Sequence, residues 1–387
     1  MDISSHSSLS QSSPSDRIAR INYTRQALLY DSPSYRLDST DVASWIQRSW
    51  QRCLAEGHRP EHTPAFDQLP AALLRRTLEG NHQLIQAARP VLERLGRAIE
   101  DTRYFAILTN QLGVVVDVNG AIDRSDRRAD LITRIGTDLS ERQLATTAIG
   151  AALAELQPVW LHRGEHFFES NCVYSCAGAP LFDPDGVCTG MLDLTGIEAA
   201  ERPELKHLVA QSARSIENAL TMMRLTVARD LLVRLNWPGR ALGDVTDGLV
   251  CLDADGYVMG ANLMARQMVP QLSVRPVSLQ HSSELFATTF ESLFDAARRA
   301  DVQPLELALW TGLRVHALPM MSHEPVTRLP VAPRIAAPSI QPLKDIETAL
   351  IRQAVDDARG NVLQAAKALG VSRATVYRRL GSALRRR

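Results

Sequence analysis

The chain has 387 residues, which is enough for two or three domains of ordinary size. Hydrophobic residues make up 45% and charged residues 22%, a composition that excludes disorder as the dominant state. The 43 basic and 43 acidic side chains cancel, but residues 341–387 contain ten Lys or Arg and only four Asp or Glu. This uneven charge predicts a polyanionic partner for the C-terminal end or, alternatively, a solvated basic tail.

No apolar run approaches the ~18 residues of a membrane helix, and the five cysteines are an odd, sparse set. Both features favour a protein of the reducing cytoplasm, without disulfides and without a membrane partner. The first fifteen residues contain eight serines, which predicts a disordered tail over residues 1–38 rather than a secretory signal. A helical region is expected over residues 39–84, and Asp41 is the expected N-cap of the first of three helices, at 42–52, 70–77 and 78–99.

From Tyr104 the pattern becomes strand-like. Residues 104–120 are rich in β-branched and aromatic side chains, and Asn119-Gly120 predicts a hairpin turn because both turn positions need a positive φ. Residues 179–196 predict a second hairpin, which turns at Pro184-Asp185-Gly186. Residues 205–234 contain neither proline nor glycine, and they predict one long helix that joins two domains or pairs two subunits.

A second α+β unit is expected further along the chain. The pattern predicts a hairpin over 247–262 that turns at Asp255-Gly256, helices over 263–268 and 285–299, and two strands over 305–318 around Thr311-Gly312. Five prolines over residues 322–342 then indicate a semi-rigid linker.

The C-terminal segment predicts three helices joined by short turns at Gly360 and Gly370. Helix–turn–helix is a DNA-binding arrangement, in which the last helix meets base edges. From Ser372 to Arg387 there are six arginines and no acid, and arginine suits both guanine and phosphate contacts. The alternative is a packed helical hairpin with a basic tail. The expected DNA-binding residues are Lys367, Ser372, Arg373, Thr375, Tyr377, Arg378, Arg379, Arg385, Arg386 and Arg387.

The stretch ARGNVLQAAKALGVSRATVYRRL, at residues 358–380, resembles the DNA-binding region of the Fis family. Upstream, IQRSWQRCLAEGHRP at 46–60 is similar to the N-terminal signature of activators related to the acetoin catabolism regulator. TTAIGAALAELQPVWLHRGEHFF at 146–168 and SCAGAPLFDPDGVCTGMLDLTG at 175–196 resemble the GAF sensory domain of that group. The hairpin at 247–262 is more distantly similar to a PAS unit.

The resemblance implies an α+β multidomain bacterial transcription regulator: GAF-like over 85–222, PAS-like over 235–321 and helix-turn-helix over 343–387. Its partners would be operator DNA, a small organic effector such as a ketone, alcohol or aromatic compound, a second copy in a homodimer, and RNA polymerase or an ATPase-bearing relative. No enzymatic activity and no cofactor are expected.

The sequence departs from these activators in one respect. They carry a sigma-54-interacting ATPase with a P-loop, whose glycines are followed by lysine. None of the 21 glycines here precedes a lysine, and the three lysines are Lys206, Lys344 and Lys367. We therefore expect regulation without ATP hydrolysis. The alternative is an adaptor that modulates an ATPase-bearing relative through mixed dimers or competition for sites.

Other polar clusters give weaker signals. His162, His166, Cys172 and Cys176 are ligand types that suit zinc, but their spacing is not that of a common zinc motif, and packing explains them better. Turn chemistry explains Asp183 and Asp185, and no acid–base partner is evident for Asp193. An effector pocket is expected to use Trp160, His166, Phe167 and Tyr174, with core packing of the aromatic residues, Phe168 included, as the alternative.

Overall fold

The computed structural model describes residues 14–31, 42–226, 229–274, 276–299, 303–322 and 362. The chain divides into one unit of residues 1–325 and another of residues 326–387. Apart from Ser322 and Val362, the expected proline-rich linker and the expected helix-turn-helix lie outside the described residues. Among the helices that are described, none is long and apolar enough to cross a membrane.

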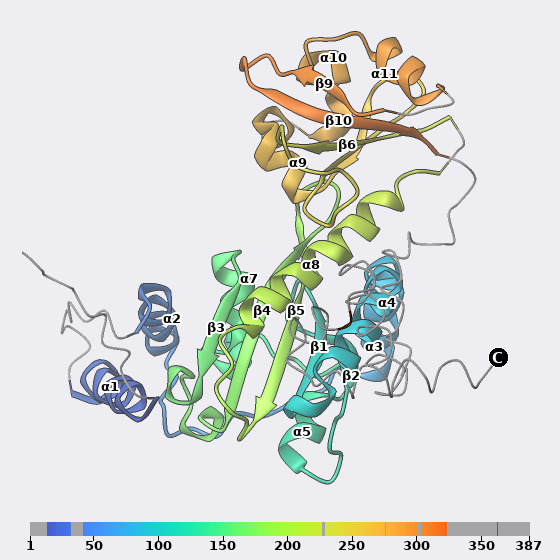
Figure 1. Ribbon diagram of the computed structural model, residues 1–387. Helices are drawn as coiled ribbons and strands as arrows, with labels where there is room; N and C mark the ends of the chain where they lie inside the picture. The colour runs from blue at the N-terminus through green and yellow to red at the C-terminus, as the bar shows by residue number, and fades with distance from the viewer. Residues whose placement is uncertain are drawn as a thin grey trace, which may run out of the picture. The chain divides into compact units, whose positions relative to one another are not determined.

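An antiparallel five-stranded sheet is the centre of the first half of the chain (Figure 1). Its strand order is β2-β1-β5-β4-β3. The longest pairing joins β4 and β5, from Tyr174 opposite Ile197 to Phe182 opposite Cys188. The strands are β1 (Tyr104–Asn110), β2 (Val115–Gly120), β3 (Val159–His162), β4 (Tyr174–Phe182) and β5 (Cys188–Ile197).

The two faces of this sheet are covered by different helices. Side chains of a strand alternate between faces, so Leu192 and Leu194 join the core beneath α4 (His82–Ala98) and α8 (Leu205–Met222). Met191 points to the opposite core. That second core is covered by the short helices α5 (Arg127–Ile132), α6 (Glu141–Leu144) and α7 (Ala148–Glu155). Residue 193 therefore faces α5–α7, in the middle of an apolar layer.

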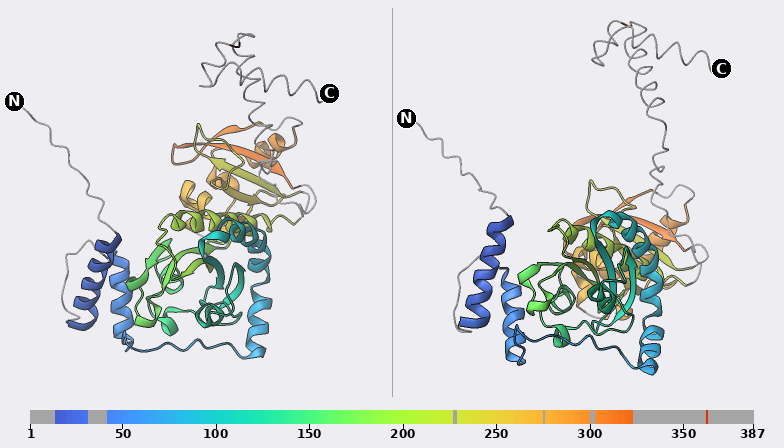
Figure 2. Two further views of the ribbon diagram at one scale, coloured as in Figure 1. Left: turned by 60° about the horizontal axis from the view of Figure 1, so that its bottom comes forward. Right: turned by 90° about the horizontal axis from the view of Figure 1, so that it is seen from below.

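The N-terminal segment contains more structure than its serine content indicates. Residues 14–31, expected to be disordered, form α1 (Pro14–Gln26) and the π-helical η1 (Ala27–Asp31). Buried Ile21 and Leu28 join a cluster with Trp50 of α2, and this burial offsets the cost of ordering the segment. Figures 1 and 2 show α1 and α2 side by side. The other helices of this region are α2 (Ser44–Ala55) and α3 (Ala71–Gly80), and the N-cap of α2 is Ala43 rather than Asp41.

The first hairpin turns at a different place from the one predicted. Asn119-Gly120 lies at the end of β2, and the chain turns instead between Asn110 and Val114. The Asn110 side chain accepts hydrogen bonds from the backbone N–H of Leu112 and Val114, both at 3.0 Å. Gly113 supplies the positive φ, +81°. The reversal of the chain between β1 and β2 is thus made by an Asx turn at Asn110 and not by the Asn119-Gly120 pair.

The long helix predicted over residues 205–234 is wrong in its second half. Helix α8 ends at Met222, and residues 231–236 form strand β6 (Leu231–Asn236). This strand lies in the middle of a second antiparallel sheet of order β8-β7-β6-β10-β9. A short, largely apolar run fits either a buried strand or part of a buried helix, so periodicity alone does not distinguish the two.

The remaining elements of the second sheet follow the predictions more closely. Hairpins turn at Gly256 and Gly312, with φ of +87° and +86°. Helix α9 coincides with the predicted 263–268, whereas the predicted 285–299 helix is shorter. The elements are β7 (Gly248–Leu252), β8 (Val258–Ala261), α9 (Leu263–Met268), α10 (Ser282–Leu285), α11 (Phe290–Ala297), β9 (Leu305–Ala308) and β10 (Arg314–Met321).

Candidate effector-binding cavity

A cavity of about 30 Å³ lies inside the first α+β region, between the sheet and helices α5–α7. About 10–15 Å³ of such space holds one water molecule, so the cavity accepts only a very small occupant without widening. Apolar side chains form most of its wall, and a few polar groups converge on it, as in ligand sites. We call it the Asp193 cavity. Its polar lining residues are Thr147, His166, Asn171, Tyr174, Cys176, Asp193 and Thr195.

Asp193 is the most unusual of these groups. Its side chain lies on β5 and is 1% exposed. One carboxyl oxygen accepts a hydrogen bond from the Thr195 hydroxyl, and the other, Oδ1, is buried without a partner among the described residues. Burial raises the pKa of this carboxyl from 3.8 to about 7, because a buried charge is poorly solvated. The group can therefore be either acid or carboxylate near neutral pH.

His166 presents a hydrogen-bond acceptor to the same space. Its Nδ1 lies 3.0 Å from the Arg163 carbonyl, which can only accept, so Nδ1 carries the proton. Burial lowers the pKa of His166 to about 4, and the ring is neutral at pH 7. The other nitrogen, Nε2, is then a lone-pair acceptor, and in the part of the chain that the structure describes it is buried without a partner. Two unsatisfied polar atoms thus lie in the wall of one cavity.

The remaining polar groups make nucleophilic chemistry unfavourable here. The Cys176 thiol lies 3.4 Å from the Thr195 hydroxyl, and burial raises its pKa well above 9, so it stays protonated. Burial also raises the pKa of the Tyr174 hydroxyl. The cavity is suited to hold a small neutral molecule that donates a hydrogen bond to His166 and pairs with the Asp193 carboxyl.

The structure brings half of the predicted effector residues to this cavity. His166 and Tyr174 line it. Trp160 packs instead against the core beneath α4 and α8, and Phe167 is buried in the cluster with α1 and α2, edge-on to Phe168. Asp193 is a lining residue that the sequence analysis left without a role. The sequence feature that could have indicated this role is that Asp193 is a carboxylate within an apolar strand, with no turn beside it.

The other polar residues singled out in the sequence have separate partners. His162 Nδ1 lies 2.7 Å from the Ser175 hydroxyl, and the Cys172 thiol lies 3.6 Å from the Phe168 carbonyl. Within the described residues, no group of three or more His, Cys, Asp or Glu is arranged to hold a metal. Asp183 accepts from the backbone N–H of Asp185 and Val187, both at 2.9 Å, as turn chemistry predicts. The predicted DNA-binding residues, Lys367 to Arg387, lie outside the described residues.

Two protein-family models match this chain. The model described as "MimR, N-terminal domain" matches residues 24–218, half of the chain and all of the cavity. The model described as "Bacterial regulatory protein, Fis family" matches residues 342–381.

Several curated relatives of this chain are named as transcription regulators. The acetoin catabolism regulatory protein of Cupriavidus necator is 32% identical over 65% of this chain and 37% of its own length. The propane 2-monooxygenase operon transcriptional activator MimR of Mycolicibacterium smegmatis is 29% identical over 65% of this chain and 41% of its own length. The chain thus spans about two fifths of the length of these relatives. Among solved structures, the Escherichia coli DhaR(N)–DhaL complex aligns with 73% of this chain and 100% of that chain, at 16% identity and a TM-score of 0.44.

Proposed function

We propose that this chain, which belongs to the family defined by the MimR N-terminal domain, is a sequence-specific DNA-binding transcription regulator controlled by a small molecule. The observation that carries the proposal is the Fis-family match at residues 342–381, because it coincides with the most basic part of the sequence. Its arginines supply guanine and phosphate contacts. A homodimer would place two recognition helices one DNA turn apart.

The Asp193 cavity is the proposed sensor. A buried carboxyl oxygen and a buried imidazole nitrogen without partners are costly, and a ligand that satisfies both recovers that cost. The chemistry selects a small neutral molecule with a hydroxyl donor, such as an alcohol or a hydroxy-ketone. Acetoin, the compound in the name of the Cupriavidus relative, belongs to this class. Because the cavity is only about 30 Å³, binding must move its walls, and that movement can change DNA affinity.

The last part of the proposal is that the chain regulates transcription by occupying a DNA site rather than by hydrolysing ATP. The 387 residues contain no Gly-Lys step with which to build a P-loop. The second sheet, proposed as PAS-like, would lie in sequence between the sensor and the DNA-binding segment. The output would then be to block polymerase, to recruit it, or to compete with an ATPase-bearing relative for sites.

The test is a gel-shift titration of the purified full chain on DNA from upstream of its own gene, with and without acetoin, acetone and 2-propanol. We expect specific binding, and one of these probes should change the affinity by about 5- to 150-fold. The variant Asp193→Leu should lose the response, and Asp255→Asn, at an exposed turn, should keep it. Absence of DNA binding by the pure chain would contradict the proposal and support the adaptor alternative.

A further inference from the structure

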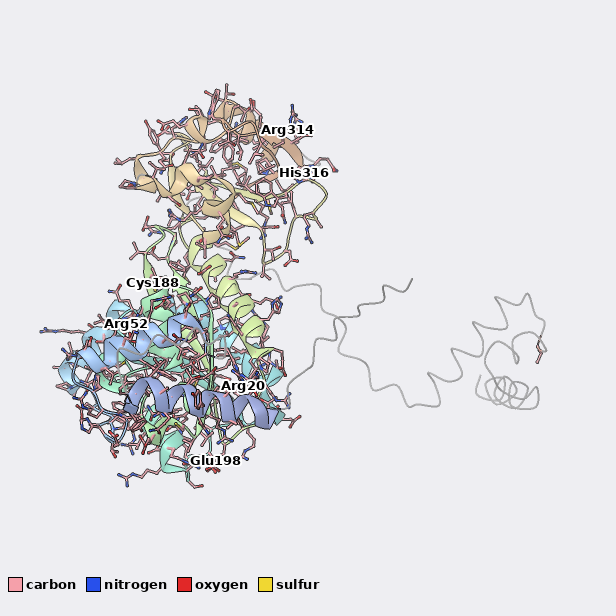
Figure 3. All side chains as sticks on the ribbon, turned by 90° about the vertical axis from the view of Figure 1, so that its left-hand side faces the viewer. Arg20, Arg52, Cys188, Glu198, Arg314 and His316 are labelled. Atoms are coloured by element: carbon pink, nitrogen blue, oxygen red, sulfur yellow. The ribbon has the colours of Figure 1, made fainter. Side chains whose placement is uncertain are left out.

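We propose that helix α1 and η1, residues 14–31, form a strap that controls access to the Asp193 cavity, with Arg25 as the residue that positions His166. The proposal rests on the proposed function only for the identity of the molecule that enters. Figure 3 looks onto α1 and α2, with Arg20 labelled on α1 and Arg52 on α2.

One irregular segment connects the strap to the cavity. Residues 163–171 comprise η3 (Arg163–Glu165), residues 166–168 and η4 (Glu169–Asn171), and they contribute two cavity-lining side chains, His166 and Asn171. The strap contacts this segment along its length. Arg17 pairs with Glu165 at 2.8 Å, and the Tyr30 hydroxyl lies 2.6 Å from Glu169 Oε1.

Arg25 makes the central contacts of the strap. Its side chain is buried, and its guanidinium donates hydrogen bonds to the backbone carbonyls of Gly164, His166 and Phe167. Bonds from a charged donor are stronger than those between neutral groups. With the carbonyls of this stretch turned toward Arg25, the His166 ring occupies the cavity wall, where its Nε2 is left without a partner. Arg25 therefore acts on the cavity through the backbone, without lining it.

The backbone beneath the strap is tightly constrained. Arg163 has a φ of +53°, which is unfavourable for a residue with a side chain. A Cβ at Gly164 would lie 3.0 Å from Asn22 Oδ1 of α1, so glycine allows the close approach. From the other side, the Trp50 indole of α2 donates to the Glu165 carbonyl at 3.1 Å. The segment thus holds a strained conformation because α1 and α2 enforce it.

This segment is the part of the cavity wall that the strap holds in place. Asp193 Oδ1 and His166 Nε2 are buried, so a ligand must displace part of the wall to reach them. Most of the other walls are strands of the sheet and helices α5–α7, whose backbone bonds are made within regular structure, whereas Phe66 and Leu139 contribute from irregular segments. Residues 163–171 are anchored by side chains of α1, η1 and α2 in addition to backbone bonds, which include Phe167 N–H to the Thr146 carbonyl at 3.2 Å and Glu169 N–H to the Pro60 carbonyl at 2.9 Å. Release of the strap frees this segment without breaking the sheet.

The experiment measures cavity access through a buried thiol. Cys176 lines the cavity, whereas Cys251 is buried in the second sheet, and burial raises the pKa of both thiols. The full chain is treated with methyl methanethiosulfonate at pH 8, and labelling of each cysteine is followed by peptide mass spectrometry. In Arg25→Ala we expect Cys176 to react about tenfold faster or more, with Cys251 unchanged, because only local opening is favoured. In Arg25→Lys, the rate of Cys176 labelling should lie between the rates in the wild type and in Arg25→Ala.

Arg48→Ala is the matched control, because it removes an arginine whose ion pair with Glu155 lies on the exposed side of α2. Its Cys176 labelling should equal that of the wild type. An unchanged Cys176 rate in Arg25→Ala overturns the proposal. If the labelling of Cys176 and Cys251 accelerates equally in Arg25→Ala, the variant Tyr30→Phe decides between the explanations. Faster labelling of Cys176 alone in Tyr30→Phe supports the strap. Equal acceleration of both cysteines, or no acceleration, rejects it. The measurement uses neither DNA nor effector, so its result does not depend on whether the proposed function is correct.

Discussion

At the scale of single residues, the candidate site was only partly visible in the sequence. His166 was predicted because it lies in a stretch that resembles a sensory domain, and Tyr174 because of its aromatic side chain; both line the cavity. Asp193 was missed because its significance comes from burial between a sheet and α5–α7, and no sequence neighbour reveals that environment. The same holds for Glu217, whose pKa burial raises to about 8 while it accepts from the Phe182 N–H at 3.0 Å.

Asp193→Asn tests whether the buried carboxyl costs stability. The folded-state pKa of about 7 lies above the ordinary value of 3.8, so the wild type has its full stability below pH 3.8 and loses part of it as pH rises through 7. The asparagine variant has no proton to lose. Its free energy of unfolding should therefore exceed that of the wild type at pH 8 by up to about 4 kcal/mol, and this advantage should vanish near pH 4. Urea denaturation of both proteins at the two pH values measures the difference; a pH-independent difference would show that Asp193 titrates normally.

At the scale of elements, the hairpins predicted to turn at Gly186, Gly256 and Gly312 do turn there, and each of these glycines has a positive φ. Gly120 also has a positive φ, but it lies at the end of β2 rather than in a turn between two strands. The errors came from tertiary structure: an Asx turn at Asn110 replaced the Asn-Gly turn, and burial in a sheet turned the end of a predicted helix into β6. Local pattern determines element type only where the surroundings of the element do not override it.

The β4–β5 turn also contacts the second α+β region. The Pro184 carbonyl accepts from the Ala261 N–H at 2.9 Å and from the Arg266 guanidinium at 2.8 Å. A Cβ at Gly186 would lie 2.8 Å from Arg266 Cζ. Arg266 is buried and also donates to the Leu272 carbonyl at 2.6 Å, so it cannot swing away freely.

Gly186→Ala should therefore destabilise the protein more than Gly312→Ala. Both glycines have a φ near +85°, but no atom lies within 4 Å of a Cβ at Gly312. The shared backbone strain costs about 1 kcal/mol, and overlap with Arg266 adds about 1–3 kcal/mol at Gly186 alone. Equilibrium urea unfolding of the two variants measures the difference. An equal loss of unfolding free energy in both would contradict close packing of the turn against Arg266.

At the scale of the whole molecule, the charge is segregated along the sequence. The C-terminal 47 residues, 341–387, hold ten of the 43 basic residues and four of the 43 acidic ones. The Fis-family match, at residues 342–381, lies entirely within this stretch. A basic segment attached to a chain that is otherwise acidic binds a polyanion through that segment, and the rest of the chain repels it. This segregation predicts two separable contributions to DNA binding.

The first contribution is base recognition and the second is charge. Arg373→Ala or Arg378→Ala should cost about 1–3 kcal/mol on the specific site and relax sequence preference. Replacement of Arg385, Arg386 and Arg387 by alanine should weaken binding to every sequence and flatten the slope of log affinity against log salt concentration. Fluorescence anisotropy on specific and scrambled duplexes between 50 and 200 mM salt, a range of roughly the width that resolves such slopes, separates the two effects. Unaltered specific binding in all three variants would show that the recognition helix lies elsewhere.

The last prediction concerns the source of energy for regulation. A P-loop holds a triphosphate with successive backbone N–H groups and offsets its charge with the lysine that follows the glycine. No glycine of this chain is followed by lysine. The chain should therefore release no phosphate from ATP, with or without DNA, and a reporter under its control should respond equally in strains with and without sigma-54. Saturable ATP turnover by the pure chain would contradict the first expectation. Loss of the response without sigma-54, together with no ATP turnover, would instead indicate competition with an ATPase-bearing relative, because occupancy of a shared site alters output only where that relative can act.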